Sequence, residues 1–127
     1  MDTKQVIVIR KDLHMRKGKM VAQGGHAVMK VFFDLMQEID ANERRLPLDE
    51  EMKHWIDGNY RKVTVSVNSE EELLQIYEMA KQRGLRCSII QDNGLTEFHG
   101  VKTYTAVAVG PNEESKVNEV TGHLPLL

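Results

Sequence analysis

The side chains best suited to chemistry in this sequence fall on one face of an expected helix. Lys19, Gln23, His26 and Lys30 recur every three or four residues, which at roughly 100° per residue places them in a stripe about 60° wide. Lys19 lies in the first turn, beside backbone N–H groups that attract anions, so it could bind a phosphate or stabilise an oxyanion. Periodicity alone favours an ordinary solvated helix face, and a catalytic stripe is the alternative.

Asp92 and Thr96 could add an anion and a hydroxyl to Lys19. Asp92 follows an expected strand and Thr96 comes four residues later, so both lie at the carboxyl end of that strand, where open α/β sheets bind their ligands. If the first and third strands run parallel, Lys19 and Asp92 share one edge of the sheet. The run Asp92-Asn93-Gly94 is also typical of a plain turn, and spacing alone does not separate the two interpretations.

Cofactor motifs are missing from the sequence. Gly18-Lys19 is followed by Met20 instead of Ser or Thr, so the pair does not form a phosphate-binding P-loop. The sequence also has no Gly-x-Ser-x-Gly elbow and no His-Glu-x-x-His spacing, and we therefore expect neither a nucleotide nor a metal as cofactor. The other histidines are expected in loops or on the surface. Cys87 is expected to be a buried, unreactive thiol, and Trp55 is expected to pack rather than to stack on a base.

Size and composition indicate one ordinary globular domain. The chain has 127 residues, of which 41% are hydrophobic and 28% charged, and this is enough apolar material for one core. Its lone cysteine cannot form an internal disulfide, which favours an intracellular, cytoplasmic protein. The apolar run near the N-terminus is too short for a signal peptide or for a membrane span of about 20 residues.

Basic residues are concentrated at the start of the chain. The net charge of the whole chain is −2, but seven Lys and Arg against two Asp give residues 1–30 a net charge of +5. A local cationic surface suits a polyanion bound at one face, and the absence of aromatic residues between positions 10 and 19 favours phosphate contacts over base stacking. On charge alone, a solvated face remains the simpler explanation.

Hydrophobic patterns predict alternating strands and helices along the chain. Strands are expected over residues 5–10, 61–67, 87–91 and 103–109, the last of them ending at Gly110-Pro111. Helices are expected over residues 18–41, 49–56 and 112–120, and a further helix runs from a cap at Asn68 or Ser69 to Gly84. Residues 42–48 are expected to form a loop.

The connections between these elements predict the fold class. Helical crossovers imply parallel strands with helices on both faces of the sheet, whereas the short link before the last strand allows an antiparallel member. We therefore predict an α/β fold, a three-layer α/β/α sandwich around a mixed four-stranded sheet, formed by residues 1–127 as a single domain.

The longest helix should pack through its apolar side. The hydrophobic residues opposite the Lys19 stripe are Val21, Val28, Phe32, Leu35 and Ile39. Gly24 and Gly25 lie near that side, although glycine inside a helix costs about 1 kcal/mol relative to alanine. We interpret these two glycines as the place where the helix approaches the sheet or a neighbouring helix closely.

Taken together, these residues resemble the type 2 peptidyl-tRNA hydrolases, the archaeal and eukaryotic form of this enzyme. The resemblance covers nearly the whole chain, and its motifs together are far more specific than any one of them. In chain order they are Lys4 to Leu13, Met15, Gly18-Lys19, Ala22-Gln23, His26-Ala27, Trp55 with Gly58, Lys62-Val63, Ser69 with Glu70 to Leu73, Asp92 with Gly94 and Thr96, Gly100 with Thr103, Ala108 to Pro111, and Val120 to Gly122 before Leu124 and Leu127.

The resemblance implies a metal-independent hydrolase that cleaves the ester bond between a peptide, or an N-blocked amino acid, and the 3′ end of tRNA, and so recycles tRNA from aborted translation. Lys19 would supply electrostatic stabilisation, Asp92 would position or activate the water, and Thr96 with Gln23 would hydrogen-bond the ester. The family also implies His26 and Thr103 as catalytic residues. The cations expected to contact the phosphates of the tRNA acceptor stem are Arg10, Lys11, Arg16, Lys17 and Lys30.

The chain departs from the family pattern at several positions. Gly24 and Gly25 replace a common Cys-Ser, while Asn93, Leu95 and Val101 replace a small polar or alanine residue, a basic residue and a threonine. If such changes removed turnover, the same fold would serve as a non-catalytic module that binds the tRNA end, or as an adaptor for a partner protein. A homodimer is compatible with a domain of this size.

Overall fold

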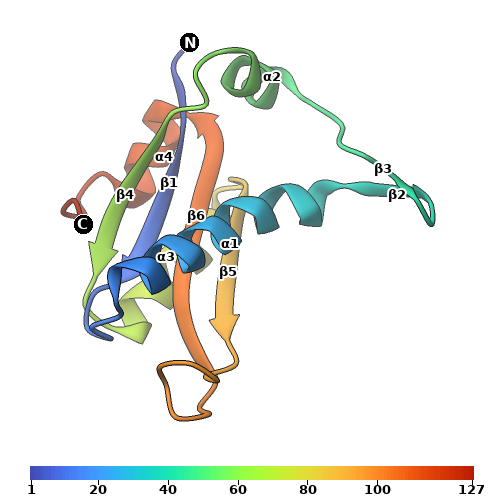
Figure 1. Cartoon of the computed structure of the whole chain (residues 1–127). Coiled ribbons are helices and arrows are strands. Elements are labelled where there is room, and N and C mark those ends of the chain that lie inside the picture. Colours follow the sequence, from blue (N-terminus) through green and yellow to red (C-terminus); the bar gives the residue numbers. More distant parts are fainter.

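Four strands form the central sheet of the computed structural model, which describes residues 1–127 (Figure 1). Their order across the sheet is β4 (Lys62–Val67), β1 (Thr3–Arg10), β6 (Thr103–Glu113) and β5 (Cys87–Asp92). β1 and β4 are parallel, whereas β6 runs antiparallel to both β1 and β5. The predicted mixed sheet is therefore confirmed, and β1 and β5 run in the same direction.

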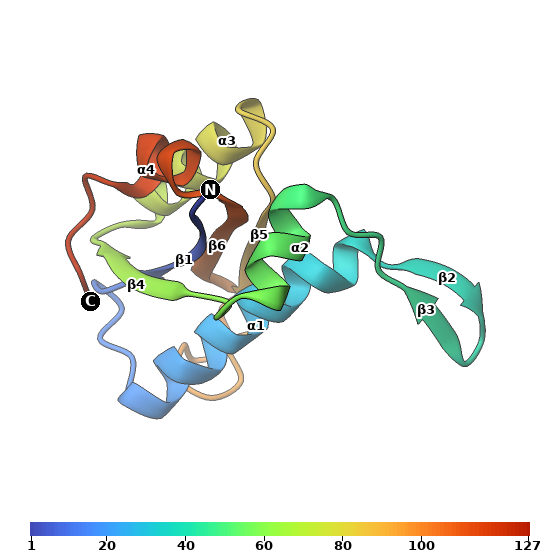
Figure 2. The same cartoon turned by 90° about the horizontal axis from the view of Figure 1, so that it is seen from above.

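Helices cover both faces of the sheet (Figure 2). α3 (Glu70–Gln82) and α4 (Glu114–Thr121) lie on one face, and α1 (Lys17–Leu35) lies with α2 (Glu50–Asp57) on the other. The rings of Phe32 and Trp55 stack with centroids 5.6 Å apart and join α1 to α2. The three-layer α/β/α sandwich predicted from the sequence is thus confirmed. None of the helices is long and apolar enough to cross a lipid bilayer.

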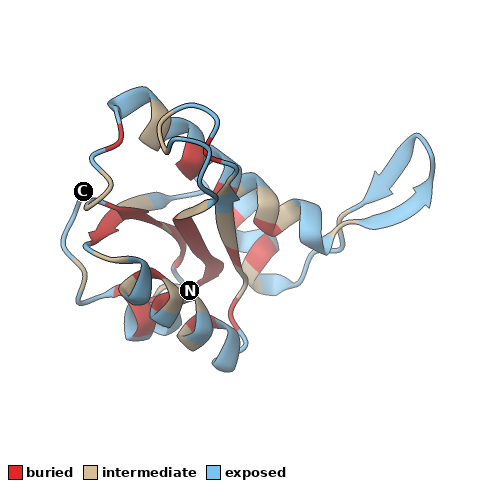
Figure 3. Ribbon diagram, turned by 90° about the horizontal axis from the view of Figure 1, so that it is seen from below, coloured by how far each residue is buried: buried red, intermediate tan, exposed pale blue.

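Side-chain alternation along the strands separates two hydrophobic cores of unequal size. Val6 and Val8 of β1 contribute to a core of twelve buried residues beneath α3 and α4. Ile9 of β1, with Ala106 and Ala108 of β6, contributes to a core of only six buried residues beneath α1. The buried residues gather on the sheet and on the inner sides of the helices (Figure 3). The small side chains on the second face allow α1 to lie close to the strands.

Helix α1 packs on the sheet through a different face from the one predicted. Its buried residues are Gln23, Gly24, Ala27 and Val31. Val21 and Leu35, both expected to be buried, are 76% and 41% exposed. Small residues allow α1 to pack closely on β1: a Cβ at Gly24 would lie only 3.3 Å from the Ile7 side chain. The close approach predicted at Gly24 is confirmed, but the one predicted at Gly25 is wrong, since Gly25 faces open space.

Beyond α1 the chain forms a hairpin that the sequence did not predict. α1 ends at Leu35 because Met36 takes an extended backbone, with a ψ of 141°. β2 (Gln37–Asp40) and β3 (Glu43–Arg45) then pair antiparallel and project away from the sheet (Figures 1 and 2). The helix predicted as far as residue 41 and the loop predicted from residue 42 were therefore wrong. Every residue of both strands is exposed, so no hydrophobic alternation marks them in the sequence.

The other predicted boundaries agree with the structure to within two residues, except at the end of β6. Ser69 caps α3, as expected, because its side chain accepts a hydrogen bond from the Glu72 N–H. β6 was predicted to stop at Gly110-Pro111 but continues to Glu113. It continues because residues 112–113 pair with the start of β1.

Candidate active site

Lys19 and Asp92 meet at one edge of the sheet. Lys19 lies in the first turn of α1, and Asp92 is the last residue of β5. Lys19 Nζ donates a hydrogen bond of 2.9 Å to Asp92 Oδ1. The expectation that parallel first and third strands would bring these residues to a shared edge is confirmed. The two side chains are only 14% and 12% exposed, so the ion pair is partly shielded from water.

Thr96 joins the ion pair from the loop that follows β5. Its Oγ1 accepts a 2.7 Å hydrogen bond from Lys19 Nζ. Gly94 shapes this loop, because its φ is +83° and a Cβ there would clash with the carbonyl oxygen of Val101. The Gly94 N–H also donates to Asp92 Oδ2 at 2.9 Å. The loop therefore fixes both the carboxylate and the hydroxyl that contact Lys19.

Gln23 and Thr105 extend the cluster into the interior. Gln23 is 2% exposed and its Nε2 lies 3.4 Å from Asp92 Oδ1, to which it donates. The Thr105 hydroxyl in β6 donates to Gln23 Oε1. Because this bond occupies the amide oxygen, it turns the Gln23 amide nitrogen toward the Asp92 carboxylate. Gln23 was predicted as a site residue from the sequence, but Thr105 was not.

A β-bulge directs Thr105 toward α1. The register shifts between Ile90 and Gln91 of β5, which leaves Thr105 as an extra residue in β6. Strict alternation from Val107 would have placed Thr105 on the face of the larger core. At the bulge that position is taken by Tyr104, which packs against the larger core. No pattern in the sequence marks the bulge, and this explains why Thr105 was missed.

The Asp92 carboxyl is held in its ionised form. Burial alone would raise its pKa, but hydrogen bonds from Lys19, Gly94 and Gln23 outweigh burial and hold the pKa below its ordinary value. A carboxylate with a lowered pKa is a weak base. It is therefore better suited to hold and orient a water molecule than to remove its proton.

The cluster keeps unused hydrogen-bonding capacity. An ammonium has three N–H donors, and Asp92 and Thr96 take two of those of Lys19, so one remains for a substrate oxygen. A carboxylate oxygen can accept about two hydrogen bonds, and Asp92 Oδ2 receives one from the Gly94 N–H. A free donor thus stands beside a free acceptor. This arrangement can stabilise an oxyanion and hold a water at an ester.

The side chains of the remaining predicted catalytic residues make no hydrogen bond within the cluster. His26 is exposed on α1 and makes no hydrogen bond to Lys19 or Asp92. Thr103 pairs with Asp92 across the strands, but its hydroxyl donates to the carbonyl of Val101 at 2.9 Å. Of the predicted catalytic residues, the structure brings together Lys19, Gln23, Asp92 and Thr96.

Arg10 is not available as a surface cation, contrary to the sequence-based prediction. Its side chain is 10% exposed. The guanidinium donates to both carboxylate oxygens of Asp12 and to the Tyr104 carbonyl. These internal bonds and its low exposure hold the Arg10 side chain against the protein, so Arg10 serves the fold.

The other predicted tRNA contacts remain on the surface. Lys11, Arg16 and Lys17 are exposed immediately before and at the start of α1. Arg16 lies within 3.8 Å of Glu97 but its side chain stays 91% exposed. Lys30, further along α1, forms an ion pair of 3.1 Å with Asp34. The cationic surface at the start of the helix is therefore accessible to a polyanion.

Several side chains that could have carried chemistry have structural roles or lie on the surface. Burial raises the pKa of the Cys87 thiol, which keeps it unreactive, although the residue is only half-buried. Trp55 is buried and its indole N–H donates to the Arg61 carbonyl, which confirms its predicted packing role. No three His, Cys, Asp or Glu side chains lie close enough together to hold a metal ion. The histidines expected on the surface are exposed: His14, His54, His99 and His123.

Comparisons with known proteins match this chain over almost its whole length. A family model described as Peptidyl-tRNA hydrolase PTH2 matches residues 3–127. A protein named Peptidyl-tRNA hydrolase from Methanocaldococcus jannaschii is 49% identical over 124 residues, which are 98% of this chain and 99% of that protein. Proteins of the same name from Methanopyrus kandleri and Staphylothermus marinus are 40% and 39% identical, over 98% of this chain and 97% and 94% of their own lengths. Because the family model spans nearly every residue and these relatives align from end to end, the chain belongs to the peptidyl-tRNA hydrolase PTH2 family, which confirms the resemblance found in the sequence.

Proposed function

We propose that this chain hydrolyses the ester bond between a peptide, or an N-blocked amino acid, and the 3′ end of tRNA, with Lys19 and Asp92 at the reacting centre. The observation that carries this proposal is the 2.9 Å contact between Lys19 Nζ and Asp92 Oδ1. In the reaction, a water oxygen bonds to the ester carbonyl carbon, the bond from this carbon to the ribose oxygen breaks, and one water proton passes to the ribose oxygen. The products are a free peptide and a tRNA that can be charged again.

Lys19 and Asp92 have different roles at the carbonyl carbon. The free N–H of Lys19 stabilises the negative charge on the carbonyl oxygen, and a donor in such a position is worth roughly 100-fold to 1,000-fold in kcat. Asp92 holds the attacking water through the free lone pair of Oδ2. The lowered pKa of Asp92 supports an orienting role over that of a general base.

The neighbouring polar residues have supporting roles. The Thr96 hydroxyl accepts from Lys19, so its own hydrogen is free to donate to the ester. Gln23 is buried and both ends of its amide are engaged, so we assign it to positioning Asp92. Thr103 pairs with Asp92 across the strands and His26 follows Gln23 by three residues on α1, and we propose both as contacts for bound substrate and not as reacting groups.

The tRNA is expected to bind through its phosphates. The exposed cations Lys11, Arg16 and Lys17 lie beside the first turn of α1, where Lys19 also begins, and Lys30 follows on the same helix. Such contacts release counterions, so affinity for tRNA should fall steeply as salt is raised.

The substitutions that set this chain apart from the family pattern leave the reacting groups in place. Leu95 and Val101 are exposed loop residues, and Gly24 supports the packing of α1 on β1. None of these positions belongs to the cluster around Lys19. Family membership therefore favours the hydrolase over a non-catalytic tRNA-binding module or an adaptor.

The proposal includes the setting of the reaction. The substrate arises from aborted translation, so we place the activity in the cytoplasm. Lys19 supplies the positive charge at the carbonyl, and the reaction as proposed uses neither a metal nor a nucleotide. We further propose that the protein acts as a homodimer.

The proposal is tested by release of an N-blocked amino acid from blocked aminoacyl-tRNA, with EDTA present throughout. Wild type should turn over, and Lys19→Ala and Asp92→Ala should each lose nearly all activity. Lys53→Ala is the matched control, because Lys53 forms a lysine–aspartate ion pair with Asp57 on exposed α2, and it should keep the full rate. Full activity in Lys19→Ala would refute the role of Lys19. If wild type binds tRNA in a salt-dependent way but does not hydrolyse the ester, the result would indicate the non-catalytic tRNA-binding module. If wild type neither binds tRNA nor hydrolyses the ester, the result would indicate the adaptor.

A further inference from the structure

The central sheet has two edges, and only one of them is paired with another segment of the chain. At the β4 edge, the C-terminal residues form an antiparallel bridge between Val65 and Leu126, and the Ser66 N–H donates to the Pro125 carbonyl at 2.9 Å. β5 forms the other edge of the sheet, and no strand pairs with its outer side (Figure 1). The outer side of an edge strand is a template for another extended chain.

The hydrogen-bond pattern of the sheet shows which backbone groups of β5 face outward. Hydrogen-bonded and non-hydrogen-bonded residues alternate along an antiparallel ladder. The Gly110 N–H donates to the Arg86 carbonyl at 2.7 Å, so every second residue from Arg86 to the bulge turns its backbone groups toward β6. Cys87 and Ile89 lie between these residues and turn their backbone groups to the outer edge. None of the backbone hydrogen bonds of loops and caps reaches Cys87 or Ile89, so the N–H and C=O of both are free.

This outer edge leads directly to the reacting centre. β5 ends at Asp92, whose carboxylate accepts from Lys19. Ile89 comes three residues earlier, which is roughly 10 Å along an extended strand. Gln91, between Ile89 and Asp92, is exposed. An acyl chain that leaves an ester held at Asp92 therefore has free backbone donors and acceptors beside its first few residues.

The direction of a peptide along this edge is fixed by its attachment to tRNA. The esterified residue is the C-terminal one, so a peptide that follows the edge must run toward Asp92, as β5 does. In a parallel pair, one residue uses its N–H and C=O to bond two alternate residues of the neighbouring strand. Ile89 would lie opposite about the fourth residue from the ester and bond the residues on either side of it. Such main-chain bonds do not depend on the side chains of the peptide.

We infer that the outer edge of β5 binds the peptide of the substrate as a parallel added strand, through the N–H and C=O groups of Ile89 and Cys87. The inference rests on the proposed function and extends it from the ester to the acyl chain. The exposed cations for tRNA lie at the start of α1, so the two parts of the substrate leave the ester along different elements. Binding energy gained by the peptide away from the ester raises kcat/KM.

The first test compares two blocked substrates that share one tRNA and one esterified residue. The first carries a single N-acetylated amino acid, which is too short to reach Ile89. The second carries an N-acetylated peptide of about five residues, which is long enough. Wild type should show a kcat/KM at least roughly tenfold higher on the peptide, since two ordinary hydrogen bonds correspond to such a factor. Equal values would overturn the inference and leave the proposed function intact, whereas hydrolysis of neither substrate would refute both.

The second test removes hydrogen bonds from the substrate and leaves the protein unchanged. N-methyl groups on the backbone nitrogens of the longer peptide take away its N–H donors. They should lower kcat/KM to the value for the single amino acid. Exchange of the peptide's side chains at constant length should have little effect. An advantage that survives N-methylation, or that follows the side chains, would contradict strand addition.

The third test removes a donor from the protein. Ile89→Pro lacks the outward N–H, and proline is tolerated on an edge strand where its nitrogen faces away from the ladder. Ile89→Ala is the matched control, because it loses the same side chain from the larger core but keeps the N–H. Both variants should cleave the single-residue substrate like wild type, and only Ile89→Pro should lose the advantage of the longer peptide. Equal behaviour of the two would overturn the inference. A change in Ile89→Pro of mass by sedimentation, with the advantage retained, would assign the edge to a second copy of the chain instead.

Discussion

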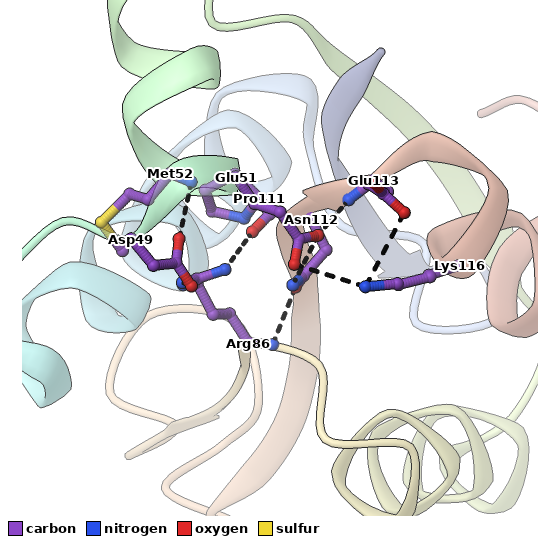
Figure 4. A network of polar contacts seen from close by, with 8 residues as sticks. All are labelled: Asp49, Glu51, Met52, Arg86, Pro111, Asn112, Glu113 and Lys116. Atoms are coloured by element: carbon purple, nitrogen blue, oxygen red, sulfur yellow. Dashed lines mark hydrogen bonds and ion pairs between the residues drawn. The ribbon is translucent and has the colours of Figure 1, made fainter. Parts of the chain in front are cut away.

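The protein carries one polar network at each end of its sheet, and the two differ in the groups that their hydrogen bonds join. The network at the start of β5 joins α2, α4 and the end of β6 (Figure 4). The site cluster at the other end of β5 joins α1, β5 and β6. Both are built from carboxylates, cations and amides. Four of the five hydrogen bonds around Lys19 and Asp92 join one side chain to another, whereas four bonds of the other network go to backbone groups.

The network in Figure 4 holds backbone groups of several segments. Arg86 contacts the Asp49 carboxylate and donates to the Pro111 carbonyl at 2.9 Å. Its backbone N–H donates to Asn112 Oδ1 at 3.0 Å, and Asn112 Nδ2 donates to Glu51. Glu51 also accepts from a backbone N–H of β6 and from a lysine of α4. These bonds tie four segments of the chain together.

The difference teaches that residue type alone does not identify a reactive site. Charged groups whose donors and acceptors are matched contribute to stability, because breaking one partner leaves the other unsatisfied. Charged side chains that are held mainly by one another, as Lys19 and Asp92 are, can present their remaining donor and acceptor to a substrate. Mutations in the cluster around Lys19 should therefore mainly lower kcat/KM. Mutations in the network of Figure 4 should mainly lower the free energy of unfolding.

The largest expected effect is that of Asp92→Asn on activity. Asparagine has nearly the same shape and its amide oxygen can still accept the Gly94 N–H, but it loses the negative charge and turns an amide nitrogen toward the donors of Lys19 and Gln23. We expect kcat/KM to fall by roughly 1,000-fold, which is about 4 kcal/mol of transition-state stabilisation, and the free energy of unfolding to fall by a smaller amount. Blocked aminoacyl-tRNA hydrolysis and urea denaturation measure the two quantities. A loss of stability as large as the loss of transition-state stabilisation would break the contrast between the two ends.

Glu51→Gln should show the opposite behaviour. The glutamine amide would present donors to groups that themselves donate, so we expect the free energy of unfolding to fall by about 2 kcal/mol at neutral pH while kcat/KM stays unchanged. Burial alone would raise the pKa of Glu51, but bonds from the Glu113 N–H and Asn112 outweigh it and keep the pKa low.

The low pKa of Glu51 predicts how this stabilisation depends on pH. Since the native pKa lies below the unfolded one, the stabilisation is complete above the unfolded value of about 4.3 and disappears as the pH falls through the native pKa. Urea denaturation of wild type and Glu51→Gln over a series of pH values should therefore give curves that converge in acid. A difference that stays constant to low pH would show that Glu51 stabilises the fold by shape and not by charge.

The sheet and its reactive edge could be predicted because their signals are local or topological. Alternation at Val63, Val65 and Val67 marks β4, and the helical crossovers predict the direction of the strands. From direction alone it followed that Lys19 and Asp92 share one edge, which the structure confirms.

The missed features depend on packing that hydrophobicity does not report. The buried side of α1 is chosen by Gly24 and by Gln23, whose polar side chain is satisfied inside the protein. Arg10 was expected on the surface, yet Asp12 two residues later pairs with its guanidinium, and the Arg10 side chain is only 10% exposed. Thr105 enters the site only because a bulge reverses the alternation of β6. Each outcome depends on contacts between segments far apart in the sequence or on a local irregularity.

A smaller effect on activity is expected from Thr105→Val, which keeps the shape of the side chain but removes the hydroxyl. The Gln23 amide would then be free to turn away from Asp92, so we expect kcat to fall about tenfold and the pKa of Asp92 to rise. Carboxyl chemical shifts recorded against pH measure that pKa. Thr105→Ser should restore both values, whereas a loss of stability without a change in the Asp92 pKa would make Thr105 a packing residue.

The smallest effect should come from Asp49→Ala, which removes one outer member of the network in Figure 4. Asp49 caps α2 by accepting the Met52 N–H at 2.9 Å, and loss of such a cap costs about 1 kcal/mol. Asp49→Asn keeps the cap but removes the charge that faces Arg86, so any difference between the two variants measures the cap apart from the ion pair. We expect Asp49→Asn to be the milder change, because Asp49 is 55% exposed and ion pairs open to water contribute little. Equal losses of stability in urea would assign the effect to the ion pair, and a change in kcat/KM in either variant would show that the two ends of the sheet are coupled.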